Sequence, residues 1–398
     1  NDMKIICPIE NCTGCSACFN ICPREAIKMS TDQYGFLYPD VLENICIDCN
    51  LCKKVCPAIN QIQQHDSLNA YAALCSEECH SSSSGGAAAA ITNYILSIGG
   101  VVYGCAQYNY KDIRHIRISA DNINDKKLLK GSKYVQSSIG RTFKQIQTDL
   151  KNGFTVLFIG TPCQVAGLKR FLMKEYSNLY TVDLVCHGVP SSKMLVEDIS
   201  KIKNVLDSDS VIFRENVNGK VCFGIFIKDF NGKLKTRIKF PNDSYLTAFM
   251  MGLSFRESCH QCKYANSSRV GDLTLADFWG LGEDSVINTS NGISLILVNT
   301  QTGKELFDKF SFLLSFEERS IDEAIRGNGQ LQKAFERPVQ KDIFLSIYMN
   351  KGIRSAVNKV GSEYISFWRK QYLKEEIIDN LSKYPFLLSL LRKIKKII

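Results

Sequence analysis

The sequence lacks the signals that would assign it to a membrane or secreted protein. No apolar run approaches the ~20 residues that span a bilayer. The first ten residues, NDMKIICPIE, have neither the basic nor the apolar segment of a signal peptide. We therefore expect a cytoplasmic protein, in which thiols stay reduced and disulfides are rare. The 17 cysteines are then expected to serve metal or redox chemistry.

Two further classes of ligand are not indicated. No Gly-x-Gly-x-x-Gly fingerprint opens a strand–helix unit, so an NAD site is not predicted. The formal net charge of +9 is concentrated at one end, because residues 350–398 carry 11 basic and 4 acidic side chains, whereas residues 1–64 carry 5 basic and 7 acidic. The positive charge is thus a C-terminal feature, and we expect no nucleic-acid partner.

Eight cysteines near the N-terminus form the strongest pattern. They fall into two runs with one spacing, Cys12-x2-Cys15-x2-Cys18-x3-Cys22-Pro23 and Cys46-x2-Cys49-x2-Cys52-x3-Cys56-Pro57. In bacterial ferredoxins, three cysteines of such a run hold one 4Fe-4S cubane and the fourth crosses to the other. The predicted ligand sets are Cys12, Cys15, Cys18 and Cys56 for cluster one, and Cys46, Cys49, Cys52 and Cys22 for cluster two. Two zinc sites are the alternative, but two complete runs favour iron–sulfur. Cys7 fits neither run and is expected to be a packed thiol.

The remainder of the chain predicts a multidomain protein of mixed α+β and α/β class. At 398 residues it is too long for one compact core. We expect a small bacterial-type dicluster ferredoxin module at residues 1–64, a larger α/β domain at 65–300 and a mainly helical region at 301–398. In the α/β domain, buried strands are predicted at 99–108, 154–160, 179–186 and 293–299, and helices at 87–99, 141–153 and 166–176.

Three predicted strand-to-helix junctions carry chemically informative residues. The segment SSSSGGAAAAI, residues 81–91, puts hydroxyls and two glycines before a helix start, which suits a phosphate. A flexible Ser/Gly linker explains it equally well. The segments FIGTPCQVAGL and DLVCHGVPSS deliver Cys163 and Cys186 to strand ends, where ligands of open α/β sheets gather.

A further pair, Cys259-x-x-Cys262, supplies only half of a four-ligand site. Because Cys163 and Cys186 follow neighbouring strands, they are the best placed cysteines to complete it. We predict a third 4Fe-4S cluster on these four residues. A zinc site and four unlinked thiols are the alternatives.

In combination, these segments resemble a known family. The stretches GSKYVQSSIGRTFKQ, VLFIGTPCQVAGLKRFL, VDLVCHGVPS, CHQCKYA and GDLTLADFWGLG are similar to the coenzyme F420 hydrogenase/dehydrogenase beta-subunit family over residues 1–300. The resemblance implies an FAD-binding α/β domain that carries one 4Fe-4S cluster, here fused to a dicluster ferredoxin. Carried over by position, the flavin site is expected at Ser83, Ser84, Gly85, Gly86, Gly131, Ser132, Lys133, Tyr134, Gln136 and Ser137. A turn leading into a strand is the alternative for the second segment.

The resemblance implies an iron–sulfur flavoprotein oxidoreductase. Electrons would pass between the ferredoxin clusters, the third cluster and FAD, and from there in pairs to or from a small-molecule hydride acceptor or donor. The expected electron partner is a low-potential donor such as ferredoxin or a partner redox subunit. No catalytic residue is assigned. A non-catalytic electron-transfer subunit is the first alternative, and a zinc-binding scaffold is a weaker one. The basic amphipathic segment Tyr384–Ile398 is expected to dock on its own domain in preference to a membrane surface.

Overall fold

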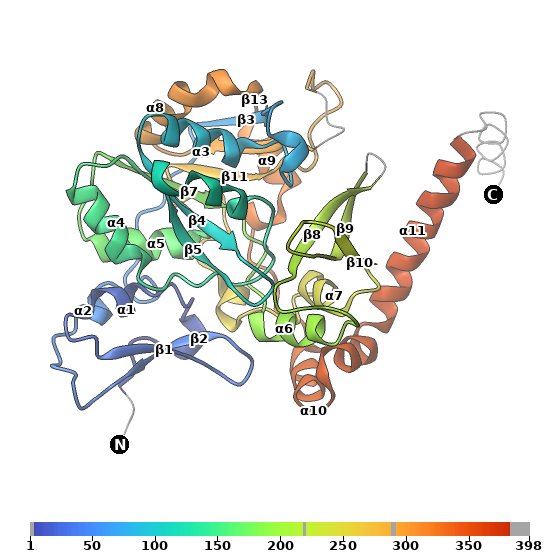
Figure 1. The fold of residues 1–398 in the computed structure, drawn as a ribbon, viewed down its shortest axis with the longest axis horizontal. Coiled ribbons are helices and arrows are strands. Elements are labelled where there is room, and N and C mark those ends of the chain that lie inside the picture. Colours follow the sequence, from blue (N-terminus) through green and yellow to red (C-terminus); the bar gives the residue numbers. More distant parts are fainter. Residues whose placement is uncertain (1–3, 218–219, 288–291, 383–398) are drawn as a thin grey trace.

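The computed structural model describes residues 4–217, 220–287 and 292–382. Its N-terminal module contains two short helices, one 3-10 turn and an antiparallel hairpin (Figure 1). The elements are η1 (Ile9–Asn11), α1 (Ala17–Ile21), β1 (Ile27–Thr31), β2 (Leu37–Val41) and α2 (Leu51–Lys54). The hairpin pairs Ile27 with Val41 and Thr31 with Leu37. The module therefore has little regular structure of its own beyond these elements.

The two cysteine runs fold in the same way. In each run the residue after the second cysteine has a left-handed backbone, with φ of 64° at Ser16 and 55° at Asn50. A short helix starts directly after it and carries the third cysteine, Cys18 in α1 and Cys52 in α2. The left-handed residue reverses the chain sharply, so the second and third cysteines of a run face the same space.

The central feature is an eight-stranded mixed sheet in the order β13-β3-β12-β11-β7-β6-β4-β5. In chain order its strands are β3 (Asn69–Leu74), β4 (Val101–Gln107), β5 (Ile113–Ile118), β6 (Val156–Gly160), β7 (Leu179–Leu184), β11 (Leu273–Asp277), β12 (Ser294–Val298) and β13 (Ser315–Arg319). The pairs β4–β6, β6–β7 and β7–β11 are parallel. The carboxyl ends of β6 and β7 therefore lie at the same edge.

Helices cover both faces of this sheet. On one face lie α3 (Ala87–Ser97) and α8 (Gln301–Phe310), which bury Ile91 and Phe307 against the strands. On the other lie α4 (Thr142–Lys151) and α5 (Pro162–Leu172), which bury Phe143 and Leu168. Each predicted strand and helix of the α/β domain thus has a counterpart in the structure, with ends that differ by a few residues. Apolar burial on both faces explains why the strands read as nearly continuous apolar runs.

The sheet continues past residue 300, into the range predicted to be mainly helical. Strand β13 pairs antiparallel with β3, matching Ser315 to Leu74 and Arg319 to Ala70. The short helix α9 (Ile321–Gly327) buries Ala324 in the cluster that contains β3 and β12. Strand β13 is an edge strand, and its sequence, SFEER, has only one apolar residue. The segment therefore could not be recognised as a strand from its apolar pattern.

A second, three-stranded antiparallel sheet was not predicted. It consists of β8 (Ser210–Val217), β9 (Lys220–Lys228) and β10 (Leu234–Lys239). A shared core joins it to α6 (Ser192–Ser200), α7 (Ser244–Met250) and α10 (Lys341–Val360). Helix α11 (Ser362–Ser382) then runs alongside (Figure 1). The segment Tyr384–Ile398 lies outside the described residues. No described helix is both long and apolar enough to cross a bilayer.

A buried ion pair joins β7 to the segment that follows Cys262. Arg269 Nη2 lies 2.9 Å from Asp183 Oδ1, and both side chains are almost fully buried. The other Asp183 oxygen accepts the backbone N–H groups of Val270 and Gly271 at 3.1 and 2.9 Å. Arg269 also donates to the carbonyl of Tyr264 at 2.9 Å. This network fixes the loop after Cys262 relative to the central strands.

We expect Asp183→Asn to lower the free energy of unfolding by roughly 3–5 kcal/mol, because it leaves the Arg269 charge buried and unpaired. Urea denaturation measures the change. The exposed pair Lys333–Glu336 provides the control, and Glu336→Gln should leave the midpoint unchanged. An Asp183→Asn midpoint equal to that of the control would contradict a structural role for the pair.

Candidate redox site

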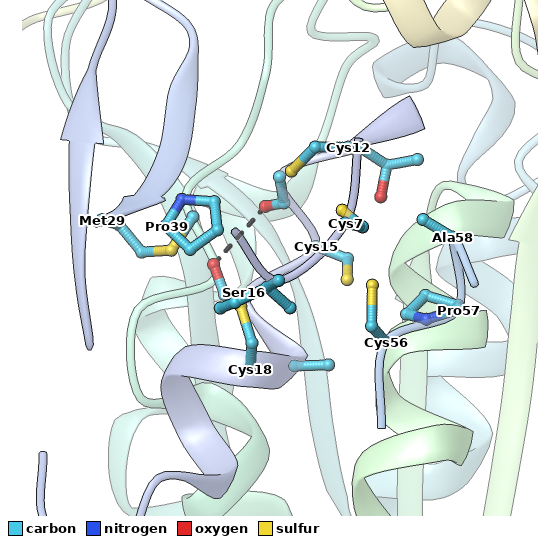
Figure 2. Close-up of a pocket in the computed structure, with 14 residues that line it drawn as sticks. Cys7, Cys12, Cys15, Ser16, Cys18, Met29, Pro39, Cys56, Pro57 and Ala58 are labelled. Atoms are coloured by element: carbon cyan, nitrogen blue, oxygen red, sulfur yellow. Dashed lines mark hydrogen bonds between the residues drawn. The ribbon is translucent and has the colours of Figure 1, made fainter. Parts of the chain in front are cut away.

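Five cysteines of the N-terminal module gather around one hollow. Cys12, Cys15, Cys18 and Cys56 line one hollow with about 350 Å³ of empty space, together with Cys7. Figure 2 shows the sulfurs of Cys15 and Cys56 directed toward one another. All five thiols are buried. This is the ligand set predicted for cluster one, with the last cysteine of the second run beside three cysteines of the first.

A second hollow, with about 700 Å³ of empty space, contains the complementary set. It is lined by Cys22, Cys46, Cys49 and Cys52, with apolar neighbours that include Ile27 and Val41. Cys49 is exposed, whereas Cys22 is buried. The fourth cysteine of each run lies just after a short helix, Cys22 after α1 and Cys56 after α2. From there each one lines the hollow that holds the other run. The soft thiolate donors in both hollows suit iron–sulfur clusters.

Cys7 is more than an isolated packed thiol. It lines the same hollow as Cys12 and Cys56 and packs with both in one buried cluster. This proximity raises the pKa of Cys7 far above the usual thiol range, and it lowers the pKa of Cys12 to about 6 and that of Cys56 to about 7. A cysteine five residues before the first run was the only sequence signal for this contact.

The four remaining predicted ligands come from three separate elements. Cys163 lies in the first turn of α5, where Thr161 and Gln164 form a capping box around Pro162. Cys186 follows β7, and Cys259 and Cys262 lie within and just after η4 (Glu257–Gln261). The amide of Val189, three residues after Cys186, donates to Cys259 Sγ at 3.4 Å. The predicted neighbouring strand ends therefore bring these residues to one region.

The four thiols influence one another electrostatically. Burial raises the pKa of Cys259 to about 12 and that of Cys262 to about 11, and neighbouring thiols, among them Cys163, add to both shifts. Cys259, Cys163 and Cys262 likewise raise the pKa of Cys186, after burial. Within the described ranges, however, no three His, Cys, Asp or Glu side chains converge closely enough to hold one metal ion. The two ferredoxin sets share this property with the third set. In a 4Fe-4S cubane each of the four thiolates binds a different iron.

The third set lies against cluster one. Helix α5 packs on α1, and a Cβ at Gly167 would approach Cys15 Sγ to 2.9 Å. Tyr264 belongs to the same buried cluster as Cys15, and Cys163 and Cys262 pack against that cluster. Burial, followed by the thiols of Cys163 and Cys15, raises the pKa of Tyr264. Only a residue without a side chain allows this contact at position 167.

The two segments predicted to bind a flavin also meet. The Ser132 amide donates to Ser83 Oγ at 2.7 Å. Gly86 and Gly131 both have φ of +84°, and Gly131 has only Ser83 Oγ within 4 Å of its ideal Cβ. Gly85 serves packing instead, because a Cβ there would lie 2.3 Å from the Ala73 carbonyl. Ser84 Oγ donates to the Ile293 carbonyl at 3.0 Å.

Part of the predicted flavin set is engaged within the protein. Gln136 Nε2 donates to the Thr13 carbonyl of the ferredoxin module at 3.2 Å. Ser137 Oγ lies 2.8 Å from His115 Nδ1. Tyr134 stacks on Phe249, with ring centroids 5.0 Å apart. The side chains of Gln136 and Ser137 are thus engaged in hydrogen bonds within the protein. A cofactor bound at these two residues would contact their backbone.

Lys133 is partly buried and follows the 3-10 helix η3 (Ala120–Leu129). Its Nζ donates to the carbonyls of Leu129 and Lys130 at 2.7 and 2.8 Å. Desolvation of this ammonium group lowers its pKa to about 8. A lysine in this state is a cation held in an apolar setting, which favours an anionic partner.

Two buried polar side chains near this region, Arg214 and His187, were not part of the predicted flavin set. Arg214 Nη1 donates to Asp277 at 2.9 Å, yet Arg214 Nε has no hydrogen-bond partner in the described part of the chain. The same holds for His187 Nε2, which lies among Phe249, Phe255 and Phe335. Such groups are rare in folded proteins and point to an absent ligand. Arg214 lies on β8, in the sheet that gave no sequence signal.

Two family matches cover separate parts of the chain. Residues 154–324 match the C-terminal part of the beta subunit of coenzyme F420 hydrogenase/dehydrogenase, and residues 11–60 match a 4Fe-4S dicluster domain. An uncharacterized ferredoxin of Methanocaldococcus jannaschii is 33% identical over 55 residues, 14% of this chain and 70% of that protein. A ferredoxin 7Fe of Hydrogenibacillus schlegelii is 42% identical over 50 residues, 12% of this chain and 58% of that protein.

Among solved structures, a similar chain occurs in the xenon-derivatized F420-reducing NiFe hydrogenase complex from Methanosarcina barkeri. Its identity to this chain is 17% and the TM-score is 0.45, over 75% of this chain and 93% of that chain. The family matches confirm the resemblance predicted from the sequence, for both the ferredoxin module and the α/β domain.

His115 provides a pH test of how this region is packed. Burial lowers its pKa from 6.5 to about 4, so the unfolded chain binds a proton before the native protein does. Acidification should therefore destabilise the native state through His115, by about 2 kcal/mol between pH 7 and pH 5. His115→Gln should remove that part of the pH dependence in urea titrations. The exposed His80 is the control, and His80→Gln should keep the wild-type profile; identical profiles for all three proteins would refute the buried, neutral histidine.

Proposed function

Because this chain belongs to the coenzyme F420 hydrogenase/dehydrogenase beta-subunit family and carries a 4Fe-4S dicluster domain at its N-terminus, we propose that it is an iron–sulfur flavoprotein oxidoreductase. The observation that carries the proposal is the row of thiol sets. Two sets occupy the ferredoxin module, and a third begins where α5 packs on α1. Gln164 of the same helix donates to the Ser137 carbonyl at 3.2 Å, in the second segment predicted to bind the flavin.

The three thiol sets define which residues would hold iron. When bound, 4Fe-4S clusters carry single electrons and a flavin pairs them for hydride-type transfer. Cys49 is the exposed ligand of cluster two, so the partner donor is expected to dock there. The ligands of cluster one are buried and those of the third set are half-buried, which limits the access of water to reduced iron.

The chain's own residues would shape the flavin end. Gly131 leaves the backbone open to close approach, whereas Gly86 is packed against Cys75 and Cys79. The N-cap residue of α3 provides no side-chain cap, and only the Ala87 amide donates to a side chain there, Ser294 Oγ at 3.4 Å, among the described residues. Such a helix start favours a pyrophosphate. Lys133 and the unpartnered Arg214 Nε would favour negative charge on the ring system.

A non-catalytic electron-transfer subunit is the second candidate. The exposed Cys49 edge and the family's description as a beta subunit both favour a partner redox protein. The two functions differ in one measurable respect. Purified protein that reduces or oxidises a small molecule with ferredoxin as its only redox partner supports the oxidoreductase, whereas activity that requires a co-purifying protein supports the subunit.

Iron content tests the third thiol set. Anaerobically reconstituted wild type should contain about 12 iron atoms per chain, and Cys259→Ala about 8, because two ferredoxin clusters remain. Cys163→Ala and Cys186→Ala should reproduce that loss. Cys222→Ala is the control, since Cys222 lies on β9 outside all three sets, and should keep all iron.

Wild-type protein that never exceeds about 8 iron atoms would contradict the third cluster. If Cys186→Ala keeps all iron while Cys163→Ala does not, the fourth ligand is another residue. A colourless protein loaded with zinc would contradict the iron–sulfur assignment as a whole.

Lys133→Ala tests the flavin end independently of iron. The variant should bind less flavin or hold it at a lower reduction potential, because a desolvated cation that favours the reduced, anionic ring is lost. Heat-released flavin and a redox titration measure these two quantities, and the iron content should stay at the wild-type value. Lys151→Ala, at the exposed end of α4, is the control and should change none of them. Unchanged flavin content and potential would remove Lys133 from the site.

A further inference from the structure

Arg256 is the most deeply buried cation at the boundary between the ferredoxin module and the rest of the protein. Only 1% of the surface of Arg256 is exposed to solvent. Arg256 Nε donates to the Cys12 carbonyl at 2.6 Å and Nη2 to the Leu37 carbonyl at 2.6 Å. Its guanidinium lies over the Tyr38 ring, 4.1 Å from the centroid. The head group therefore lies inside the module while the backbone belongs to the other domain.

The hydrogen bonds of this guanidinium all go to carbonyl or amide oxygens or to sulfur. Besides the two carbonyls, Nη1 donates to Gln136 Oε1 at 3.2 Å and Nη2 to Cys12 Sγ at 3.8 Å. Arg269 is equally buried but lies 2.9 Å from the Asp183 carboxylate. A buried charge without a counter-ion costs several kcal/mol. Arg256 pairs with no carboxylate among the described residues, so the Cys12 sulfur, with the cluster that it would hold, is the anionic partner within its reach.

Two thiol sets lie on either side of that charge. Arg256 precedes Cys259 by three residues, and its carbonyl accepts the Cys259 amide at 3.0 Å. Its amide donates to the Val189 carbonyl at 2.9 Å, in the loop that follows Cys186. Its guanidinium, in contrast, reaches Cys12 Sγ, so the side chain lies at the ligands of cluster one while the backbone lies at those of the third set.

We propose that Arg256 is a positioning residue that ties together the loops of cluster one and the third cluster. Its single charge is the counter-ion that the two clusters share. The proposal rests on the proposed function, because it requires both clusters. Each cluster with its four thiolates is an anion, and one-electron reduction adds one negative charge. A nearby buried cation therefore stabilises the reduced form of both clusters and raises their reduction potentials. No hydrogen bond of Arg256 reaches a cysteine of cluster two among the described residues.

The test compares Arg256→Gln and Arg256→Lys in the full-length, iron-loaded protein. A redox titration followed by electron paramagnetic resonance gives a midpoint potential for each cluster, and the cluster-two signal is identified as the one lost in Cys49→Ala. We expect Arg256→Gln to lower the reduced-to-oxidised ratio of cluster one and the third cluster at least tenfold at a fixed potential, which is about 59 mV for one electron. Cluster two should not shift.

Arg141→Gln is the matched control. Arg141 also bridges the two parts, since Nη1 donates to the Phe19 carbonyl at 3.1 Å, but it pairs with Glu25 and contacts no thiol among the described residues. Its removal should leave all three midpoints in place. Arg256→Lys keeps the charge while losing the guanidinium hydrogen bonds, so its midpoints should stay close to wild type. If Arg256→Gln binds too little iron to titrate, the Lys variant decides the question.

Three results would overturn the proposal in wild-type protein that contains all three clusters. The first is unchanged midpoints in Arg256→Gln. The second is a tenfold fall in Arg256→Lys, which would show that charge is not what matters. The third is an equal shift of cluster two, which would indicate a general structural effect. If the wild type itself lacks the third cluster, the proposed function fails, and its iron content shows this separately.

Discussion

The arrangement of the molecule depends on the close packing of α1 against α5. At this contact Cys15 fits against Gly167, where any Cβ would approach the sulfur to 2.9 Å. Polar contacts at the margins hold the same surfaces together, among them Arg170 to the Lys54 carbonyl at 2.6 Å and Lys263 to the Ala58 carbonyl at 2.8 Å. The ferredoxin module is thereby docked with cluster one facing inward, and Cys163 is carried by the same helix that touches it.

Burial and charge divide the thiol sets into an accessible end and an enclosed end. Cys49 is exposed, while the ligands of cluster one and the nearby Tyr264 are buried. An electron that enters at the exposed end would pass to the buried ligands of cluster one, where each fixed charge acts more strongly than at the surface. Arg256 and Lys133 matter because they are cations in that enclosed region, and their hydrogen bonds within the described residues go to no carboxylate.

The sequence predicted the ferredoxin module and the central strands well, and for physical reasons. Fixed cysteine spacing encodes local geometry, and buried parallel strands produce apolar runs that are easily recognised. Cys163 and Cys186 could be placed near each other because they follow β6 and β7, which are neighbouring strands. The ligand set that they would form with Cys259 and Cys262 stays a prediction. The second sheet could not be predicted, since β8 to β10 mix charged and apolar residues. Nor could the role of Arg256, whose partners Cys12 and Leu37 lie more than 200 residues away. The same is true of Gln136, which the family resemblance assigned to the flavin but which contacts the ferredoxin loop.

The central claim is that a third cluster lies directly beside cluster one. Electron paramagnetic resonance of the fully reduced protein tests it most directly, because neighbouring paramagnetic clusters broaden and split one another's signals. The account predicts spin–spin interaction involving three clusters, with the interaction of cluster one simplified when Cys259 is replaced by Ala. A fully reduced wild-type spectrum that contains only the pair of ferredoxin clusters, and that Cys259→Ala leaves unchanged, would contradict it.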